Sequence, residues 1–161
     1  MTYDRTALKA RLRLEEGEVL HAYQDSLGWW TIGVGHLIDA RKGGSIPPEI
    51  SDALLEWDLS RFEALLDAGI PWWRQLDDVR QQVVMDLTFN MGWAPGVAGG
   101  FDDFANTLAA LQGARWADAA AGLRKSLWYR QVGSRRAEPL CIAVETGSFP
   151  SANSTGQRNT F

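Results

Sequence analysis

The sequence predicts an α+β fold, in which a short antiparallel sheet near the N-terminus is followed only by helices. Residues 19–38 combine β-forming residues with three glycines, a pattern typical of short strands joined by tight turns. From Pro48 onward, apolar residues recur instead at the spacing of amphipathic helices. The 161 residues, 45% of them hydrophobic and 22% charged, are enough to bury a core of their own.

The first element is expected to be a helix over residues 4–16, where apolar residues are roughly helically spaced. Gly17 ends it, because glycine readily adopts the positive φ that follows many helices. Glu16 therefore stands at a helix C-terminus, where a fixed side chain can face a cleft. The sheet follows, with Asp25 and Thr31 at or near its turns. Residues 39–46 then predict a polar, glycine-rich loop.

A long helix is predicted from Pro47 and Pro48 to Gly69, because proline is well placed in a first turn and an apolar stripe follows. The stripe consists of Leu55, Leu59, Phe62 and Leu66. Further helices are expected over residues 77–91, 102–112, 115–123 and 134–144, with a break at 92–100. We expect one domain over residues 1–161: a sheet-bearing lobe (about 1–46), a connecting helix (47–69), a helical lobe (70–149) and a tail (150–161).

Composition excludes several classes of protein. The net charge of −4 argues against general nucleic-acid binding. Residues 113–136 nevertheless carry six Lys and Arg residues against one Asp, which is a local patch of +5 or an ordinary solvated helix face. The single cysteine, Cys141, allows no internal disulfide and is expected to be a buried, inert thiol. No apolar stretch approaches the length of a membrane span, and the N-terminus does not read as a secretory signal.

Two carboxylates, Glu16 and Asp25, stand nine residues apart and are followed by the Thr31 hydroxyl. A carboxylate on each side of a cleft is the minimum equipment for breaking a glycosidic bond. Such spacing alone is more often two surface groups, but the helix-ending glycine and the turn-rich sheet favour convergence on one cleft. Glu16 would act as the general acid, and partial burial would favour its protonated form. Asp25 would stay ionised and, with Thr31, hold or deprotonate a water molecule.

Other kinds of site are poorly supported. The Gly33-Val34-Gly35 segment has no third glycine or following helix at the spacing of a nucleotide-binding loop. The two histidines, His21 and His36, lack the spacing of metal ligands, so we expect no metal and no cofactor. Most of the eight tryptophans are expected in the core, although some are candidates for stacking on sugar rings.

The motif Glu-Gly-x-x-Leu-x-Ala-Tyr-x-Asp-x-x-Gly-x-x-Thr-Ile-Gly-x-Gly-His, over residues 16–36, resembles the signature of the phage-type lysozymes (endolysins, glycoside hydrolase family 24). The resemblance covers roughly residues 5–149. It continues through Phe89-Asn90-Met91-Gly92, Gly96-Val97-Ala98-Gly99 and Arg115-Trp116 to Trp128-Tyr129, and it ends around Arg135-Arg136-Ala137-Glu138.

The resemblance implies a small N-terminal lobe, a long connecting helix and a mainly helical C-terminal lobe. It implies hydrolysis of the β-1,4 bond between N-acetylmuramic acid and N-acetylglucosamine by an inverting single displacement, with carboxyl groups about 6.5–9.5 Å apart. Glu16 would be the acid, and Asp25 and Thr31 would activate the water. His36 would form a structural pair with Asp58, and Arg135 would face Glu16. Positions similar to cleft-lining residues of the family are Gly35, Leu37, Phe89, Asn90 and Thr107.

The resemblance also implies a biological setting. We expect a monomer that acts on peptidoglycan glycan strands, without nucleic acid or stable membrane insertion. It would be held in the host cytoplasm until a separate permeabilising partner gives it access to the bacterial cell wall. Two departures from many relatives are the acidic net charge and a short loop between Ile38 and Asp58. The alternatives are a lytic transglycosylase, which uses one acid and no water, and a catalytically silent wall-binding module.

Overall fold

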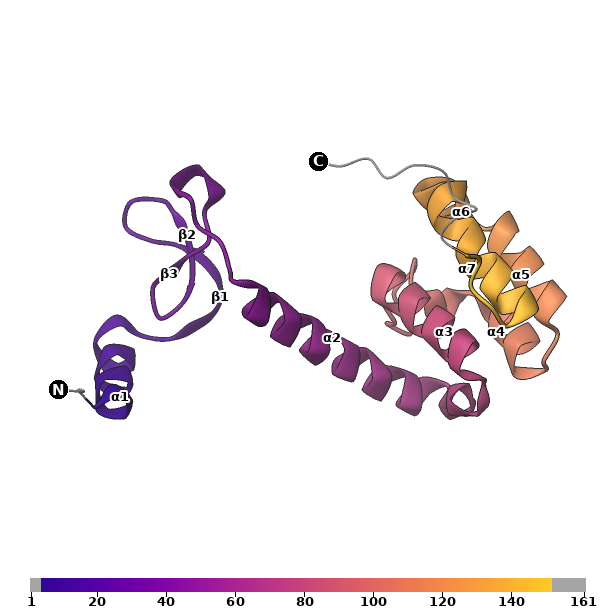
Figure 1. Cartoon of the computed structure of the whole chain (residues 1–161), viewed down its shortest axis with the longest axis horizontal. Coiled ribbons are helices and arrows are strands. Elements are labelled where there is room, and N and C mark those ends of the chain that lie inside the picture. Colours follow the sequence, from indigo (N-terminus) through magenta and orange to yellow (C-terminus); the bar gives the residue numbers. More distant parts are fainter. Residues whose placement is uncertain (1–3, 152–161) are drawn as a thin grey trace. The chain divides into compact units, whose positions relative to one another are not determined.

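The computed structural model describes residues 4–151. The chain divides between Leu54 and Leu55 into an N-terminal unit, which carries the sheet, and a helical unit. The element order confirms the predicted α+β fold, with one helix, then a three-stranded antiparallel sheet, then helices (Figure 1). Among the described residues, no helix is both long and apolar enough to cross a bilayer.

The N-terminal unit begins with α1 (Arg5–Glu16). The Asp4 carboxylate caps it by accepting hydrogen bonds from the backbone N–H groups of Thr6 and Ala7, at 2.9 and 3.0 Å. Gly17 ends the helix with φ of 77°, a value that favours glycine. The predicted helix over residues 4–16 is therefore confirmed, and Glu16 is its last residue.

The sheet has the order β1-β2-β3, from β1 (Val19–Gln24), β2 (Trp30–Gly33) and β3 (His36–Leu37). Thr31 lies on the central strand, opposite Tyr23 of β1 and Leu37 of β3. The β2–β3 turn is tight because Gly33 and Gly35 both adopt positive φ, 68° and 70°. The glycines of this segment thus serve turns, as the sequence predicted.

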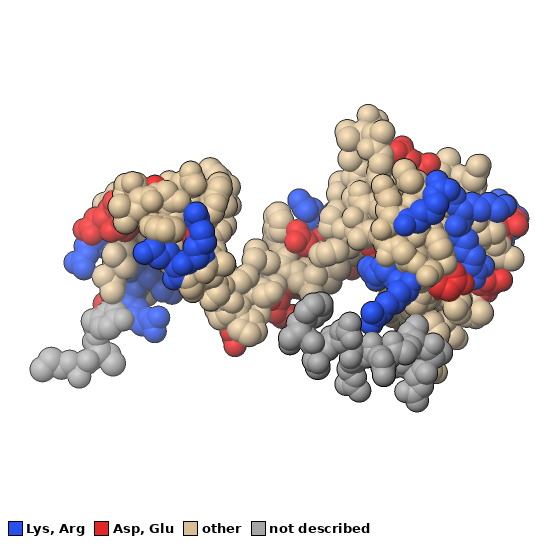
Figure 2. All heavy atoms as spheres, turned by 90° about the horizontal axis from the view of Figure 1, so that it is seen from above, with Lys and Arg blue, Asp and Glu red and all other residues tan. Residues whose placement is uncertain are grey.

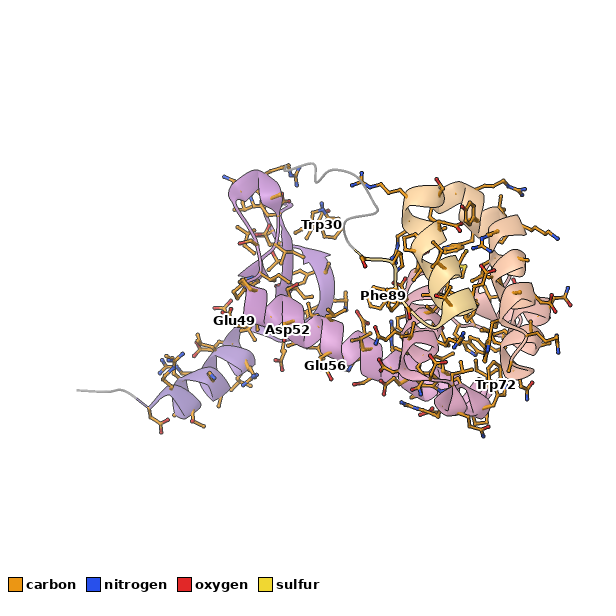
Figure 3. The ribbon with its side chains drawn as sticks, turned by 45° about the vertical axis from the view of Figure 1, so that its right-hand side comes forward. Trp30, Glu49, Asp52, Glu56, Trp72 and Phe89 are labelled. Atoms are coloured by element: carbon orange, nitrogen blue, oxygen red, sulfur yellow. The ribbon has the colours of Figure 1, made fainter. Side chains whose placement is uncertain are left out.

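The predicted long helix is α2 (Pro48–Gly69), 22 residues without interruption (Figure 1). Three acidic residues on its first half, Glu49, Asp52 and Glu56, are labelled in Figure 3 and recur at helical spacing. Negative charge near a helix N-terminus is favourable to the helix dipole. The preceding segment, predicted as loop, contains the short 3-10 helix η1 (Ala40–Lys42), which the Asp39 side chain caps.

The helical unit follows in a succession of short helices that enclose one hydrophobic core (Figure 1). Its elements are η2 (Pro71–Gln75), α3 (Asp78–Met91), η3 (Phe101–Asp103), α4 (Ala105–Gln112), α5 (Trp116–Lys125), α6 (Leu127–Val132) and α7 (Ser134–Thr146). The helices predicted over residues 77–91, 115–123 and 134–144 are confirmed. The run predicted over 102–112 begins instead as η3 and becomes α-helical at Ala105. The predicted tail lies largely outside the described residues.

Helix α6 was missed in the sequence. It is short, and it is fixed by a local cap: the Ser126 hydroxyl accepts a hydrogen bond from the Tyr129 backbone N–H at 3.1 Å. Gly133, with φ of 79°, ends it. Serine before and glycine after a helix are recognisable signals, but six residues hold too little periodicity to show an amphipathic pattern.

A buried arginine connects the two ends of the helical unit. Arg80 of α3 is 8% exposed, and its Nε donates to the Val144 carbonyl of α7 at 2.8 Å. Its guanidinium also pairs with Asp77 and lies 4.0 Å from the centre of the Trp116 ring. A buried charge is tolerated only when it is paired and hydrogen-bonded, so these partners are what allow Arg80 to stay inside.

Cys141 of α7 is buried, as predicted, and burial raises the pKa of its thiol to about 11. The thiol therefore stays protonated at neutral pH. Protonated thiols are poor nucleophiles and poor metal ligands, so a structural role is the one that fits.

Leu66→Ala tests the packing of α2 on the helical core. Leu66 is fully buried, whereas its neighbour Leu65 is 38% exposed. We expect Leu66→Ala to lower the free energy of unfolding by about 2–5 kcal/mol, because it removes buried methyl groups and leaves a cavity. Leu65→Ala, the matched control, should lower it by less than about 1 kcal/mol. Urea denaturation measures both, and equal losses would show that α2 does not pack as described.

Candidate active site

Asp25 forms the base of the β1–β2 turn. Its Oδ1 accepts hydrogen bonds from the backbone N–H groups of Leu27 and Trp29, both at 2.9 Å. The Asp25 backbone N–H donates to the Trp29 carbonyl at 3.0 Å, and the Asp25 carbonyl accepts from Gly28 at 2.9 Å. The carboxylate is thus held by the turn that it helps to form. Within residues 4–151, no protein donor engages its second oxygen, Oδ2.

Thr31 lies close to this turn on the central strand and is 4% exposed. Its hydroxyl donates to the Trp29 carbonyl at 3.1 Å, so Asp25 and Thr31 share Trp29 as a backbone partner. The hydroxyl oxygen retains lone pairs that can accept a hydrogen bond from water. Asp25 and Thr31 are therefore fixed by one local structure, as a pair that positions one water molecule requires.

Glu16 is the first residue of the predicted motif and the last residue of α1. The chain leaves the helix at Gly17, and an ion pair crosses this exit: Arg13 Nε lies 3.2 Å from Glu18 Oε1. This ion pair joins a residue before Glu16 to a residue after it and does not involve Glu16 itself. The Glu16 side chain is exposed, as a residue that meets substrate requires.

A buried carboxylate that the sequence did not reveal, Asp39, binds the backbone of the residue before Thr31. Asp39 is 4% exposed, and its carboxylate accepts hydrogen bonds from the backbone N–H of Trp30 at 3.2 Å and from that of Arg41 at 3.0 Å. The Arg41 side chain binds both carboxylate oxygens, at 2.9 and 2.6 Å. These hydrogen bonds from Arg41 hold the pKa of Asp39 well below its usual range. Asp39 therefore fixes the residue that precedes Thr31.

Four further predicted site residues are His36, Asp58, Gly35 and Leu37. The structure gives partners for the first two and positions in the sheet for the others. The His36 ring donates through Nε2 to the Ser45 carbonyl at 2.8 Å, and Asp58 forms an ion pair with Arg61 at 3.2 Å. The pairing of His36 with Asp58 stays a prediction. Gly35 lies in the β2–β3 turn, and Leu37 lies on β3 opposite Thr31.

The remaining predicted substrate contacts lie in the helical unit. Phe89 is 44% exposed near the end of α3, with its ring packed edge-on against Phe62 (Figure 3). The neighbouring Asn90 accepts a hydrogen bond from the Trp128 indole at 2.7 Å, which fixes the amide orientation. Thr107 is 4% exposed and lines a cavity of about 440 Å³ with Lys125 and Ser126. Phe89 offers an aromatic face, and Asn90 and Thr107 offer polar groups, of the kinds that bind sugars, but Phe89 and Thr107 line different cavities.

The basic segment over residues 113–136 is less positive than the sequence indicates. Arg124 pairs with Glu138 and Glu145, both at 2.9 Å, and Arg136 pairs with Asp86. Acidic side chains stand beside the basic ones on the face of the helical unit seen in Figure 2. Arg135, predicted to face Glu16, is an exposed residue of α7.

Arg124 also organises its acidic partner. Its side-chain hydrogen bonds lower the pKa of Glu138, and Glu138 in turn accepts a hydrogen bond from the Tyr129 hydroxyl at 2.8 Å and raises the pKa of Tyr129. The cluster links α5, α6 and α7 and has a structural role. Elsewhere in the described chain, no group of three or more His, Cys, Asp or Glu side chains is placed to hold a metal ion.

The sequence model of the family described as phage lysozyme matches residues 13–138, which include every predicted site residue. The chain belongs to the phage lysozyme family. It is therefore a glycoside hydrolase of the lysozyme type, with peptidoglycan as its substrate, and the predicted resemblance is confirmed.

Relatives of this family occur in different settings. The chain is 26% identical to probable T4-type lysozyme 1 of Dictyostelium discoideum, over 89% of this chain and 96% of that protein. It is 29% identical to the pre-baseplate central spike protein Gp5 of Enterobacteria phage T4, over 87% of this chain but 28% of the spike protein. It is 38% identical to the endolysin of Salmonella phage P22, over 51% of this chain and 58% of the endolysin.

Asp39→Asn tests the buried ion pair behind the site. We expect the variant to unfold at a lower urea concentration at pH 7, because Arg41 binds the ionised carboxylate most strongly. The pKa of Asp39 is lowered in the folded protein. The advantage of the wild type is thus complete above the unfolded pKa of about 3.9, and it is lost as the pH falls through the lowered folded value.

The measurement is urea unfolding of both proteins at pH 7 and at pH 3, followed by the NMR signal of the Trp30 amide. The difference between the two proteins should be smaller at pH 3. A difference of equal size at both pH values would show that the charge of Asp39 has no part in stabilising the sheet.

Proposed function

We propose that this lysozyme cleaves the β-1,4 bond between N-acetylmuramic acid and N-acetylglucosamine by a single, inverting displacement. The observation that carries the proposal is the shared anchoring of Asp25 and Thr31, which both hydrogen-bond to the backbone of Trp29. An inverting enzyme needs a base that holds water rather than one that attacks the sugar itself. The continuous family match across residues 13–138 supports treating both units as parts of one lysozyme domain.

In this mechanism Glu16 is the general acid. It would donate its proton to the glycosidic oxygen as the bond to the departing sugar breaks. A side chain at a helix end is well suited to this task, because the helix fixes its backbone while the side chain remains free to reach the substrate. The family motif, which Glu16 begins, supports the assignment.

Asp25 and Thr31 act on the water molecule. Asp25 Oδ2 would accept one proton of the water, and the Thr31 hydroxyl would accept the other as a hydrogen bond. The water oxygen is then directed to the face of the sugar opposite the departing group. Because both side chains are held through Trp29, little ordering is needed when substrate binds. Phe89, Asn90, Thr107, Gly35 and Leu37 are proposed to contact the glycan, and His36, Asp58 and Arg135 to support the site.

The proposed role of Asp25 also bears on the nearest alternative, a lytic transglycosylase. Such an enzyme needs no water, because the muramic acid itself supplies the attacking oxygen and the product is a 1,6-anhydro ring. A fixed carboxylate beside a threonine hydroxyl would have no task in that reaction. We therefore favour hydrolysis.

Glu16→Gln should reduce turnover by about 10²–10⁴-fold, because the amide has the same shape but carries no proton to donate. Glu15→Gln is the matched control, since Glu15 is a neighbouring exposed glutamate in a weak pair with Arg11 at 3.9 Å. Clearing of a peptidoglycan suspension measures the rates. Full activity of Glu16→Gln would refute its role as the acid, and wall binding without clearing by the wild type would identify a silent binding module.

The stereochemistry of the first product tests the single displacement. Water attack on a β-linked sugar from the opposite face gives the α-anomer before mutarotation. Proton NMR of soluble muropeptide oligomers during the first minutes of digestion should show the α-anomer of the new reducing end. Initial β-anomer would require a covalent intermediate, and 1,6-anhydro ends would establish the transglycosylase.

The setting is a further part of the proposal. By analogy with relatives named endolysins, we propose that the protein is a monomer stored in the host cytoplasm. A separate permeabilising partner would then admit it to the wall. Fractionation of expressing bacteria, with and without a membrane-permeabilising protein, tests this: appearance in the periplasm without the second protein would contradict it.

A further inference from the structure

A second cavity lies in the helical unit, and none of the predicted active-site residues lines it. It has a volume of about 440 Å³ and is formed by η2, the residues that follow it and the turn between α4 and α5. Its lining contains two tryptophans, Trp72 and Trp116, and two glutamines, Gln75 and Gln112. The volume is within the range of small-molecule sites.

The two tryptophans pack against the core but are less buried than the tryptophans within it. Trp73 and Trp128 are 1% and 5% exposed, and each indole N–H donates to a side chain at 2.7 Å. Trp72 and Trp116 are only half-buried. Within residues 4–151, neither indole N–H of this second pair donates a hydrogen bond to the protein. The cavity thus has two aromatic walls whose polar atoms are still available.

The glutamines near the cavity also differ in whether their side-chain amides bond within the protein. Gln81 and Gln82 use their side-chain amides inside the protein, donating to the Leu76 carbonyl at 2.6 Å and to Asp78 at 2.7 Å. Gln75 and Gln112 are exposed, and their amides engage no partner in the described part of the chain. An amide can donate and accept hydrogen bonds at once, which matches the hydroxyl and acetamido groups of an amino sugar.

One of the aromatic walls is fixed in advance. The Arg80 guanidinium lies 4.0 Å from the centre of the Trp116 ring and is itself held by Asp77 and the Val144 carbonyl. A ring held in this way loses little freedom when a ligand stacks on it, which favours binding. The lining contains one charged residue, Asp77, which is paired with Arg80. Aromatic faces combined with free amide donors and acceptors are suited to a sugar rather than to an ion.

We propose that this cavity is a second glycan-binding site, which holds one or two N-acetylated sugar units of a peptidoglycan strand without cleaving them. The identity of the polymer rests on the proposed function. Trp72 and Phe89 lie near opposite ends of α3 (Figure 3). At 1.5 Å per residue, Asp78 and Phe89 are separated by about 16 Å along that helix. The second site is therefore separate from the predicted substrate contacts around Phe89.

The charge of the molecule explains why such a site is useful. A net charge of −4, with several basic side chains occupied by internal ion pairs, gives little general attraction to an anionic wall. Stacking on sugar rings is independent of charge. Binding through Trp72 and Trp116 should accordingly be insensitive to salt, which distinguishes it from adsorption through the basic segment.

The first test follows the eight indole N–H signals in ¹⁵N-labelled wild-type protein during titration with chitotriose, a trimer of N-acetylglucosamine. The signals of Trp72 and Trp116, assigned by substitution, should shift together with one dissociation constant. Those of Trp73 and Trp128 should move far less. If Trp72 and Trp116 are unaffected at millimolar trimer, or if only signals elsewhere respond, the site is refuted.

The second test measures sedimentation with insoluble peptidoglycan in about 0.05 and 0.5 M salt, between which the Debye length changes about threefold. Trp72→Ala should weaken binding by about tenfold at both salt concentrations, the loss expected for one stacked ring. The double variant Gln75→Ala/Gln112→Ala changes only exposed side chains and should also weaken binding. It keeps the test decisive if Trp72→Ala does not fold. Trp57→Ala is the matched control, because Trp57 is 61% exposed on α2, outside this cavity.

Turnover of a short soluble muropeptide separates this proposal from the catalytic one. The Trp72 and glutamine variants should retain wild-type turnover while losing wall binding. Unchanged wall binding in these variants would overturn the second site and leave the catalytic proposal intact. Loss of turnover only in Glu16→Gln, with wall binding retained, would support both.

Discussion

The N-terminal unit depends on the Asp25 carboxylate, whose two oxygens have different surroundings. Asp25 Oδ1 accepts the two backbone hydrogen bonds that close the β1–β2 turn, so the turn cannot form as described without it. The same bonds orient Oδ2, the atom assigned to the water. The Thr31 hydroxyl donates to the Trp29 carbonyl, and the Asp39 carboxylate accepts a hydrogen bond from the Trp30 backbone N–H. In the proposed mechanism, the carboxylate that closes the turn is also the base, so the geometry of the base would follow from that of the turn.

Local signals made much of this architecture predictable. Gly17 ends α1 as expected, and the glycines place the turns of the sheet. The length of α2 is as predicted, but of its apolar stripe only Leu66 is buried, and Leu55 is 45% exposed. Each of these signals acts over a few residues, so the sequence displays it directly. The motif around Glu16 and Asp25 was equally local, but its reading as a lysozyme needed the family resemblance in addition to the chemistry of paired carboxylates.

Interactions between distant residues were not predictable in the same way. Asp39 looked like part of a polar loop, and only its buried position beside Trp30 shows that it anchors the sheet. The positive patch over residues 113–136 was correctly counted, but its partners, such as Asp86 and Glu145, lie outside that segment. Charge in a sequence is a sum over residues, whereas attraction for a partner depends on which charges remain unpaired after folding.

The Arg80 contacts have a consequence for the order in which the molecule is completed. The ribosome releases α3 long before α7, yet Arg80 binds carbonyl oxygens 64 and 65 residues further along the chain. Until Val144 has emerged, a charged group destined for the interior lacks these acceptors, and the core around it cannot close. The Arg80 site, and with it the helical unit, is therefore completed only after α7 has been synthesised.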